Sequence, residues 1–370
     1  MSKINLLHVI STLCFGGAEK QVVTLLRELD KDKYNITLCC LRAGGPLEEE
    51  LKHEDIDIVF LRMRVRYFFI ALYRLVRLCK KKHIQIVHTH LYDPSFWGRI
   101  AAWIAGVPVI VATEHGRGMW KKKRHLFFER IANRFTDVRI AVSEDVRSIR
   151  IQREHAPPQK VLMIPNAISP DDFIVLDDVR EEKRKEFGLK NGDLVFGTVA
   201  RFDPDKALDK LLEAAVFVAE SIRHIRILLV GDGPLRKYLE DYAEKLGISD
   251  KIIFTGMRKD IAGLLSIMDV YVNSSIREGI PVSLLEAMAA EKAVVATCVG
   301  GNPEVVHDES VGLIVPPQNS KALADGIIAL LRNKQLRESM GSKARERIQN
   351  NYSIKMQARK IESIYEKLLN

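Results

Sequence analysis

Short apolar runs rich in Val and Ile alternate along the chain with longer segments whose apolar residues recur at helical spacing. Each run is continuously apolar, a pattern typical of strands buried on both faces of a parallel sheet. In the first half the runs are Ile4–Ile10, Tyr34–Leu41, Ile56–Leu61, Ile84–Thr89, Pro108–Thr113 and Val138–Val142. In the second half they are Leu194–Ala200, Ile225–Val230, Lys251–Phe254, Val270–Asn273, Val294–Thr297 and Gly312–Val315. The pattern predicts an α/β protein with two Rossmann-like, doubly wound parallel-sheet domains.

A break in this alternation near residue 170 predicts the boundary between the two domains. The chain there runs Pro165-Asn-Ala-Ile-Ser-Pro-Asp-Asp and then through the charged stretch Asp177–Lys185, which is typical of a link. We predict an N-terminal domain over residues 1–170 and a C-terminal domain over residues 171–351. Residues 352–370 have an amphipathic pattern, and we expect this helix to pack back on the N-terminal domain. Ligands should bind at the carboxyl ends of the strands, in a cleft between the facing domains.

The composition fits a protein of this class. A length of 370 residues suits two domains, and 47% hydrophobic with 28% charged residues is ordinary for a soluble globular chain. No apolar run approaches the ~20 residues of a membrane span, and Met1-Ser-Lys leads directly into the first predicted strand. The five cysteines are scattered without metal spacing, as expected for reduced thiols. We expect a cytoplasmic protein without a secretory signal.

The net charge of +9 is concentrated in the first half. Residues 1–170 hold 28 Lys and Arg against 17 Asp and Glu, whereas the remainder holds 29 against 31. Two basic clusters lie among aromatic residues, which suits peripheral contact with the anionic inner face of the cell membrane or with an acidic acceptor. The alternative is the solvated face of a basic protein. The predicted membrane-facing residues are Arg62, Arg64, Arg66, Lys121, Lys122 and Lys123.

Two strand ends in the first half carry candidate site residues. Gly16 and Gly17 follow the first strand and precede a helix near Ala18, where glycine permits positive φ and close approach of a ligand, although a plain tight turn is the alternative. His115 follows the fifth strand, at a position that should face the ligand, although a lone histidine is often structural. His88 and His90 end the preceding strand, so these three imidazoles are candidates to cluster. We predict no metal site, because no carboxylate lies at ligand spacing.

The second half supplies cations and glycine-rich turns at its strand ends. Arg201 and Lys206 follow a strand and precede a helix, an arrangement that suits a diphosphate. The acidic pair Asp203 and Asp205 between them predicts a turn and helix cap rather than a metal site. Two further turns carry candidate binding residues: Gly231 in Gly-Asp-Gly-Pro, and Met257 and Arg258 in a loop suited to hold a base through backbone groups.

The stretch from Arg277 to Val306 contains two carboxylates, Glu278 and Glu286, with seven residues between them. Pro281 is tolerated in the first turn of a helix, so a helix opening there would aim its free backbone N–H groups at one spot. Such a terminus is a natural phosphate site. The residues around it are Gly279, Ile280, Pro281, Val282, Ser283 and Leu284.

Together these pieces resemble the retaining nucleotide-sugar glycosyltransferases of family 4, which have the GT-B fold. The resemblance covers nearly the whole chain in order, and its most specific part is the stretch with Glu278 and Glu286. The supporting motifs are Gly-Gly-Ala-Glu after the first strand, Ala-Thr-Glu-His at 112–115, Ala-Val-Ser at 141–143, Ile-Pro-Asn at 164–166, Arg201 with Lys206, and Gly-Asp-Gly-Pro at 231–234. Glu291 stands where family members usually have Gly in a turn, which leaves the backbone shape there in doubt.

The resemblance implies a role for each candidate residue. Arg201 and Lys206 would clamp the donor diphosphate, and His115 would contact the transferred sugar near its reacting face. Glu278 would bind hydroxyls of that sugar, and Glu286 the ribose hydroxyls. The remaining donor-binding residues would be Gly16 and Gly17, which close over the diphosphate, Gly231, the base-binding Met257 and Arg258, and the phosphate-binding amides from Gly279 to Leu284.

The resemblance also implies the reaction. A hexose or N-acetylhexosamine would move from a nucleotide diphosphate sugar, UDP-linked rather than GDP-linked, to a lipid-linked or cell-surface glycan precursor. No cofactor or metal is expected, the anomeric configuration would be retained, and we favour front-face attack. Two alternatives remain open at this point: a nucleotide-sugar isomerase of the same fold, and a non-catalytic nucleic-acid-binding protein. The second lacks any recognisable nucleic-acid-binding motif, so we expect no nucleic acid partner.

Overall fold

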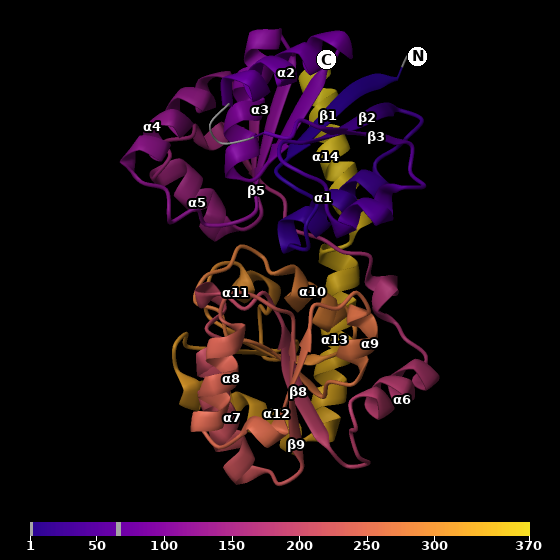
Figure 1. Ribbon diagram of the computed structural model, residues 1–370, viewed down its shortest axis with the longest axis vertical. Coiled ribbons are helices and arrows are strands. Elements are labelled where there is room, and N and C mark those ends of the chain that lie inside the picture. Colours follow the sequence, from indigo (N-terminus) through magenta and orange to yellow (C-terminus); the bar gives the residue numbers. More distant parts are fainter. Residues whose placement is uncertain (1–2, 64–67) are drawn as a thin grey trace. The chain divides into compact units, whose positions relative to one another are not determined.

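The computed structural model describes residues 3–63 and 68–370 (Figure 1). The chain divides into two compact units. Unit 1 consists of Met1–Ala167 together with Ile354–Asn370, and unit 2 of Ile168–Ser353. None of the helices in the described part of the chain is long and apolar enough to cross a membrane.

Unit 1 contains a seven-stranded parallel sheet with the order β3-β2-β1-β4-β5-β6-β7. From β1 the strands β2 and β3 follow on one side, whereas β4 to β7 follow on the other side. The carboxyl ends of the neighbours β1 and β4 therefore form a topological switch point. Six strands coincide with the predicted runs, and β7 was not predicted because it has only three residues, two of them exposed. The strands are β1 (Ile4–Ile10), β2 (Tyr34–Cys40), β3 (Ile56–Phe60), β4 (Ile86–His90), β5 (Val109–Glu114), β6 (Val138–Ala141) and β7 (Val161–Met163).

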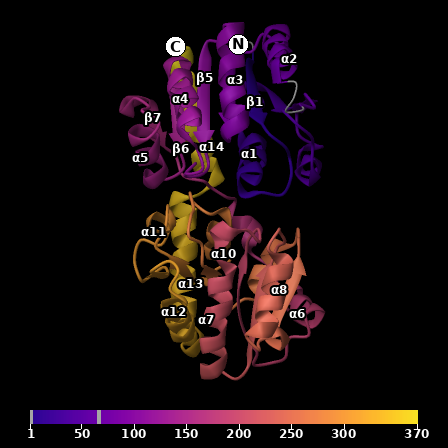
Figure 2. The same cartoon turned by 60° about the vertical axis from the view of Figure 1, so that its left-hand side comes forward.

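Helices cover both faces of this sheet. On one face α1 (Gly17–Glu28) packs beside the C-terminal helix α14 (Ile354–Leu369), which places Ile361 and Tyr365 in the same core as strand β1. On the other face α2 (Phe68–Lys81), α3 (Tyr92–Ala105) and α4 (Lys123–Ala132) lie side by side, as Figure 2 shows. The helix α5 (Glu144–Gln152) follows β6. Short 3-10 turns lie at Pro46–Leu51, Asn133–Phe135 and Pro158–Lys160.

Unit 2 contains a six-stranded parallel sheet with the order β10-β9-β8-β11-β12-β13, and its switch point lies between β8 and β11. The strands are β8 (Leu194–Val199), β9 (Ile225–Val230), β10 (Ile252–Gly256), β11 (Val270–Asn273), β12 (Ala293–Thr297) and β13 (Leu313–Val315). The helices are α6 (Asp177–Glu186), α7 (Leu208–Ser221), α8 (Arg236–Lys245), α9 (Ile261–Ser266), α10 (Val282–Ala289), α11 (Asn302–Val305), α12 (Ser320–Arg332) and α13 (Lys334–Asn351). Further 3-10 turns are η5 (Pro170–Phe173), η6 (Pro204–Lys206) and η7 (Ser249–Lys251). Because β8 and β11 are the switch-point strands, the loops that follow them are the places where a ligand is expected.

Candidate active site

The loop after β8 holds Lys206 in a fixed turn. The Asp203 carboxylate accepts a hydrogen bond from the Asp205 N–H at 3.1 Å and so caps η6, as predicted for this acidic pair. Ala207 then takes a left-handed conformation with φ 45° before α7 begins at Leu208. A left-handed alanine is strained, and such residues persist where the surroundings over-determine the backbone. Here the turn is fixed by the neighbouring loop.

The loop after β11 is bonded to this turn at two points. The Ile276 N–H donates to the Asp205 carbonyl at 2.8 Å, and the Ser274 hydroxyl donates to the Lys206 carbonyl at 2.8 Å. These bonds bring the Lys206 Nζ atom within 2.7 Å of Glu278 Oε1. Burial alone would lower the pKa of Lys206, but the facing Glu278 carboxylate outweighs it and raises that pKa above its ordinary value. The switch point of unit 2 therefore carries a firmly charged ammonium.

The hydrogen bonds that the described residues donate to the Glu278 carboxylate all go to one oxygen. Besides Lys206, Oε1 accepts from the Ser275 hydroxyl at 2.6 Å and from Asn273 Nδ2 at 3.3 Å. Within the described part of the chain no donor is paired with the second oxygen, Oε2. The carboxylate is thus oriented by three donors and has one oxygen left to accept hydrogen bonds from a ligand.

A second layer of residues supports Glu278. Asn302 Nδ2 donates to Asn273 Oδ1 at 3.1 Å and to the Thr297 carbonyl at 2.9 Å. Gly300 has φ +52°, and a Cβ atom there would lie 2.1 Å from the Glu278 carbonyl oxygen, so only glycine allows this close approach. The sequence reasoning missed Asn273 and Asn302. The available signal was the position of Asn273 as the last residue of a buried strand.

The helix α10 begins at Val282 directly after Pro281, as predicted. The Gly301 N–H donates to the Gly279 carbonyl at 2.6 Å, which anchors the approach to the helix from the Gly300 turn. Within the helix, Ser283 Oγ accepts a hydrogen bond from the buried Tyr271 hydroxyl at 2.8 Å. Glu286 lies one turn further along α10, and the exposed fraction of this residue is only 3%. The helix terminus and both carboxylates therefore lie in one stretch at the carboxyl end of β11.

The structure places the other predicted donor residues of unit 2 at neighbouring strand ends. Arg201 is exposed, and within the described residues its guanidinium makes no hydrogen bond or ion pair. Gly231 has φ +129° and donates its N–H to the Gly256 carbonyl at 3.0 Å. Met257 is exposed, whereas the Arg258 guanidinium is paired with two carboxylates, Asp260 at 2.6 Å and Glu186 at 2.7 Å. The base-binding prediction for Arg258 therefore rests on its backbone rather than its side chain.

In unit 1 the Gly16-Gly17 turn differs from one expectation. Gly16 has φ −162°, which is extended backbone open to any residue, and it directly precedes α1 at Gly17. The positive φ that glycine permits is therefore not used at Gly16. What remains of the prediction is the position of the pair at the carboxyl end of β1, the switch-point strand of unit 1.

His115 follows β5 and is joined to the other imidazoles. Its Nε2 lies 3.3 Å from His90 Nδ1. Burial lowers the pKa of His115 to about 4, against opposing effects of a hydrogen bond with Asn166 and of the Glu114 charge. Asn166 is positioned by its neighbour Ala167, whose N–H and C=O are both bonded to the Gln21 side chain. Gln357 on α14 donates to the Pro165 carbonyl at 2.5 Å, so two helices hold the Ile-Pro-Asn segment beside His115.

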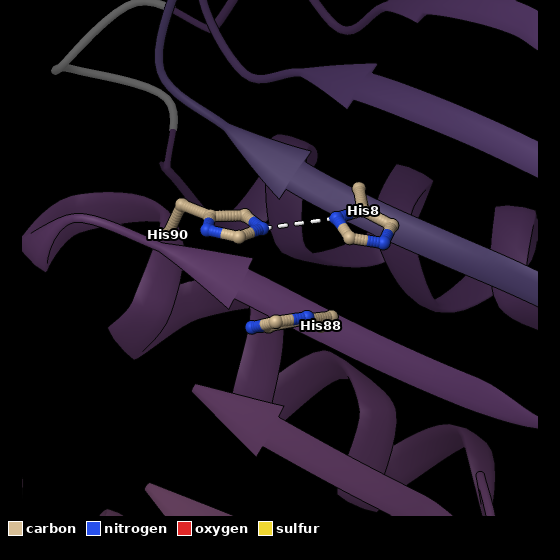
Figure 3. A group of neighbouring side chains, drawn as sticks. All are labelled: His8, His88 and His90. Carbon is tan, nitrogen blue, oxygen red and sulfur yellow. Dashed lines mark hydrogen bonds between the residues drawn. The ribbon is translucent and has the colours of Figure 1, made fainter. Parts of the chain in front are cut away.

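The histidine cluster is larger than the predicted trio, because it includes His8 from the middle of β1 (Figure 3). His8 pairs in register with His88 across the sheet, and His8 Nδ1 lies 2.9 Å from His90 Nε2. One ligating atom from each of His8, His88 and His90 lies within 4.8 Å of the others, a spacing that a metal ion tolerates. The signal that would have found His8 is a polar imidazole inside an otherwise apolar buried strand.

Lys121 corrects the membrane-surface prediction. Its Nζ atom lies 2.9 Å from both Glu129 and Glu154, and its side chain is 1% exposed. It belongs to a buried ionic cluster, which contains Arg99, Glu114, Lys121, Glu129, Arg139, Arg150 and Glu154. The buried carboxylates attract Lys121 into the interior, so it is unavailable to a membrane. Arg64 and Arg66 lie outside the described residues, whereas Arg62, Lys122 and Lys123 are exposed.

The sequence of this chain matches family models and relatives among known proteins. Residues 179–347 match the family model of group 1 glycosyl transferases, and residues 15–172 match that of Glycosyltransferase Family 4. A putative glycosyltransferase of Bacillus subtilis, EpsD, is 30% identical over 290 residues, covering 75% of each chain. The chain belongs to glycosyltransferase family 4.

Further relatives and structures agree with this assignment. The chain is 28% identical over 378 residues, 98% of its own length and 97% of the relative's, to UDP-Gal:alpha-D-GlcNAc-diphosphoundecaprenol alpha-1,3-galactosyltransferase of Escherichia coli. A crystal structure of Anabaena HepE in complex with UDP-glucose matches with a TM-score of 0.89 at 21% identity, over 98% of this chain and 100% of the other. That likeness shows the GT-B fold. This family 4 enzyme is therefore a glycosyltransferase of the retaining hexosyltransferase type with a nucleotide-sugar donor, rather than a nucleotide-sugar isomerase.

Proposed function

We propose that the enzyme transfers a hexose or N-acetylhexosamine from a UDP-sugar to a lipid-linked glycan precursor, with retention of configuration and without a metal. The observation that carries the proposal is the Lys206–Glu278 pair at the switch point of unit 2, with Glu278 Oε2 open. It is supported by the Escherichia coli relative, whose name specifies a UDP-galactose donor and a diphosphoundecaprenol-linked acceptor. The Anabaena HepE structures in complex with UDP and UDP-glucose support a UDP donor.

Lys206 and Arg201 bind the donor diphosphate in this proposal. Lys206 stays charged, and its ammonium is held at a fixed position by the bonded turn, so it stabilises the charge that develops on the leaving diphosphate. Arg201, whose guanidinium is unpaired within the described residues, adds a second cation with a planar fork that matches phosphate oxygens. The amides at the start of α10 complete the phosphate site, and Gly16 and Gly17 are further donor-binding residues in this proposal.

The two carboxylates of the motif bind hydroxyls in this proposal. Glu278 Oε2 accepts hydrogen bonds from the transferred sugar, because Oε1 is already occupied by three donors. Glu286, deeply buried on α10, accepts from the ribose. The backbone of Met257 and Arg258 contacts the base, with Gly231 shaping the adjoining turn, and His115 contacts the transferred sugar.

The proposed reaction is a front-face displacement. The bond between the anomeric carbon and the diphosphate oxygen breaks, and the acceptor hydroxyl forms the new bond on the same face. Its proton passes to the departing diphosphate. Glu278 is a poor nucleophile, because three hydrogen bonds withdraw charge from its carboxylate. Trapping of a covalent glycosyl-enzyme would contradict this step.

We further propose that unit 1 contacts an anionic membrane through the face formed by α2, α3 and α4 (Figure 2). Large apolar side chains are exposed on these helices or next to them, and exposed basic residues lie beside them. This combination suits the interfacial region of a bilayer. An enzyme that acts on a lipid-linked acceptor needs such contact. The residues of this membrane-facing surface are Phe69, Ile70, Tyr73, Trp103, Ile104, Trp120, Phe127, Phe128 and Ile131 with Lys122, Lys123, Arg124 and Arg130.

Thermal shift with a panel of UDP-, GDP- and ADP-sugars tests the donor assignment. A ligand that binds only the folded state raises apparent stability by mass action, so the UDP-sugar that serves as donor should give the largest rise in Tm. The shift should be lost in Lys206→Ala. A larger shift with GDP- or ADP-sugars would overturn the choice of base, and no shift with any nucleotide sugar would overturn the donor site.

A further inference from the structure

A chain of hydrogen bonds runs through the core of unit 1 and ends on His115. It starts at the Thr113 hydroxyl, which lies 2.6 Å from His88 Nε2, and His88 Nδ1 lies 2.5 Å from the Tyr365 hydroxyl. The Tyr365 hydroxyl is also 3.4 Å from His8 Nε2. From His8 Nδ1 the chain continues to His90 Nε2 at 2.9 Å (Figure 3) and from His90 Nδ1 to His115 Nε2 at 3.3 Å.

The imidazoles of this chain are neutral. Burial lowers the pKa of His8 to about 3 and that of His115 to about 4, and it lowers those of His88 and His90 well below their ordinary range. A neutral imidazole has one N–H donor and one accepting nitrogen. Each ring in the chain must therefore accept from one neighbour and donate to the other. The Tyr365 hydroxyl is buried, and its proton must also go to one of its two imidazole neighbours, because a buried donor without an acceptor is costly. All donors then point the same way, and only two directions are available.

Thr113 decides the direction. Its side chain is buried, and within the described residues its hydroxyl is bonded only to His88. If His88 donated to Thr113, the buried hydroxyl proton would be left without an acceptor, which is costly. With Thr113 donating to His88 Nε2, every proton is used: His88 donates to Tyr365, Tyr365 to His8, His8 to His90, and His90 to His115 Nε2. The proton of His115 is then on Nδ1.

We propose that Thr113, His88, Tyr365, His8 and His90 are positioning residues that fix His115 as the Nδ1–H tautomer. Its buried N–H then donates to Asn166 and holds the ring in one orientation at the carboxyl end of β5. The inference rests on the proposed function for the role of His115. In this state His115 Nε2 is occupied and the ring cannot take up the acceptor proton. That agrees with proton transfer to the departing diphosphate.

A metal ion is the other explanation for three clustered imidazoles. It would need a free lone pair on one nitrogen of each of His8, His88 and His90. All six of these nitrogens lie within hydrogen-bond distance of another side chain in the chain described above. The group of candidate ligands contains no carboxylate to balance a buried divalent charge. The hydrogen-bonded chain therefore accounts for more of the geometry.

Nitrogen-15 NMR of the histidine-labelled full chain tests the tautomers directly. The chain holds 10 histidines, and in each of the four that belong to the hydrogen-bonded chain the proton should be on Nδ1, the minor form of a free imidazole. Signals of Nε2–H tautomers for His90 and His115 would overturn the proposal. Zinc that remains in the purified protein at one equivalent after dialysis against a chelator would overturn it in favour of a metal site.

Tyr365→Phe and Tyr34→Phe form a matched pair of variants. Both tyrosines are buried in the same core, and their rings pack edge to face with the ring centroids 5.9 Å apart. The Tyr34 hydroxyl has no hydrogen-bond partner within the described residues. Tyr365→Phe should mix the tautomers of His115 and lower kcat by roughly tenfold with little change in the donor KM, whereas Tyr34→Phe should change neither. Thr113→Val removes the first donor of the chain and should act like Tyr365→Phe.

The outcomes separate this inference from the proposed function. If the histidines are Nδ1–H tautomers but the protein transfers no sugar, the hydrogen-bonded chain is supported and the proposed function of His115 in transfer is refuted. If the protein transfers sugar but the histidines are Nε2–H tautomers, the proposed function is supported and the hydrogen-bonded chain is refuted. Equal kcat in Tyr365→Phe and the wild type would refute the positioning role. If both tyrosine variants lower Tm equally, Thr113→Val decides between loss of the chain and loss of packing.

Discussion

The ammonium of Lys206 lies 2.7 Å from Glu278 Oε1, and the same oxygen also accepts from Ser275 and Asn273. This sharing orients the carboxylate, and within the described residues no donor is paired with its second oxygen. In the proposed function, the residue that binds the diphosphate therefore also orients the residue that binds the sugar.

Replacing Lys206 or Arg201 by Ala should abolish useful transfer. Each change removes a cation whose contact strengthens as the leaving diphosphate gains charge, and we expect kcat/KM to fall by about a hundredfold or more. Steady-state kinetics with a UDP-sugar measures the loss. Lys210→Ala removes a nearby cation that is paired with Glu213 and serves as the control. Wild-type turnover in Lys206→Ala would rule out the clamp.

The buried ionic cluster of unit 1 should be sensitive to loss of one member. Arg139 lies 2.9 Å from Glu114 and 2.8 Å from Glu154, so Arg139→Met removes two buried ion pairs and leaves these carboxylates to the remaining cations of the cluster. We expect about 3 kcal/mol of lost stability in urea unfolding, the low end for a broken buried pair. Lys334→Ala, which breaks an exposed pair with Glu338, should leave the unfolding midpoint unchanged. Similar midpoints for the two variants would show that the cluster contributes little.

Stability should fall as the pH drops below about 6.5. The lowered pKa values of His8 and His115, about 3 and about 4, mean that these rings stay neutral in the fold while they protonate near 6.5 in the unfolded chain. The unfolded state then binds more protons, so each ring lowers the free energy of unfolding by about 2 kcal/mol at about pH 5. Urea unfolding at several pH values measures the slope. His307→Gln, at an exposed histidine, should not change it, and a flat profile across this window would contradict neutral burial.

Glu291 tests the backbone of a turn in unit 2. Its φ of 58° is left-handed, the conformation that Gly adopts without strain. Glu291→Gly should therefore raise stability by roughly 0.5–1 kcal/mol, measured by urea unfolding. Glu291→Ala is the matched control, because it also loses the distant contact with Arg345 but keeps the strain. Equal effects of the two variants would mean that the strain is negligible.

Charge reversal at Lys122 and Lys123 tests the membrane-facing surface. Each exposed lysine near an anionic bilayer contributes about 1 kcal/mol, so the double Glu variant should bind phosphatidylglycerol vesicles at least tenfold more weakly in co-sedimentation. Lys334→Glu, on α13 of unit 2, is the control for net charge. Unchanged binding of the double variant would show that this face is ordinary solvated surface.

Most of the fold was accessible from sequence because its strands are continuous apolar runs. Twelve predicted runs became strands, whereas β7, with only Val161 buried, gives no such signal. The Lys206–Glu278 site was predicted as two separate motifs. Their direct contact depends on backbone bonds between the β8 and β11 loops, which no local pattern encodes.

The remaining differences concern burial of polar residues. Lys121 belongs to a basic run and was assigned to the surface, but it is buried by Glu129 and Glu154, which lie elsewhere in the chain. His8 was overlooked inside an apolar strand, and its partners come from β4 and from α14, more than 80 residues away. Sequence patterns indicate which residues are apolar. They do not indicate which charges and imidazoles find partners in the interior.

The most direct test is transfer of a carbon-13-labelled hexose from its UDP donor to a diphosphoundecaprenol-linked acceptor, followed by NMR of the product. We predict an α-linked product from the α-linked donor, full activity in the presence of a chelator, and loss of product in Lys206→Ala. A β-linked product, a requirement for a divalent ion, or equal yield from the Lys206→Ala variant would contradict the account.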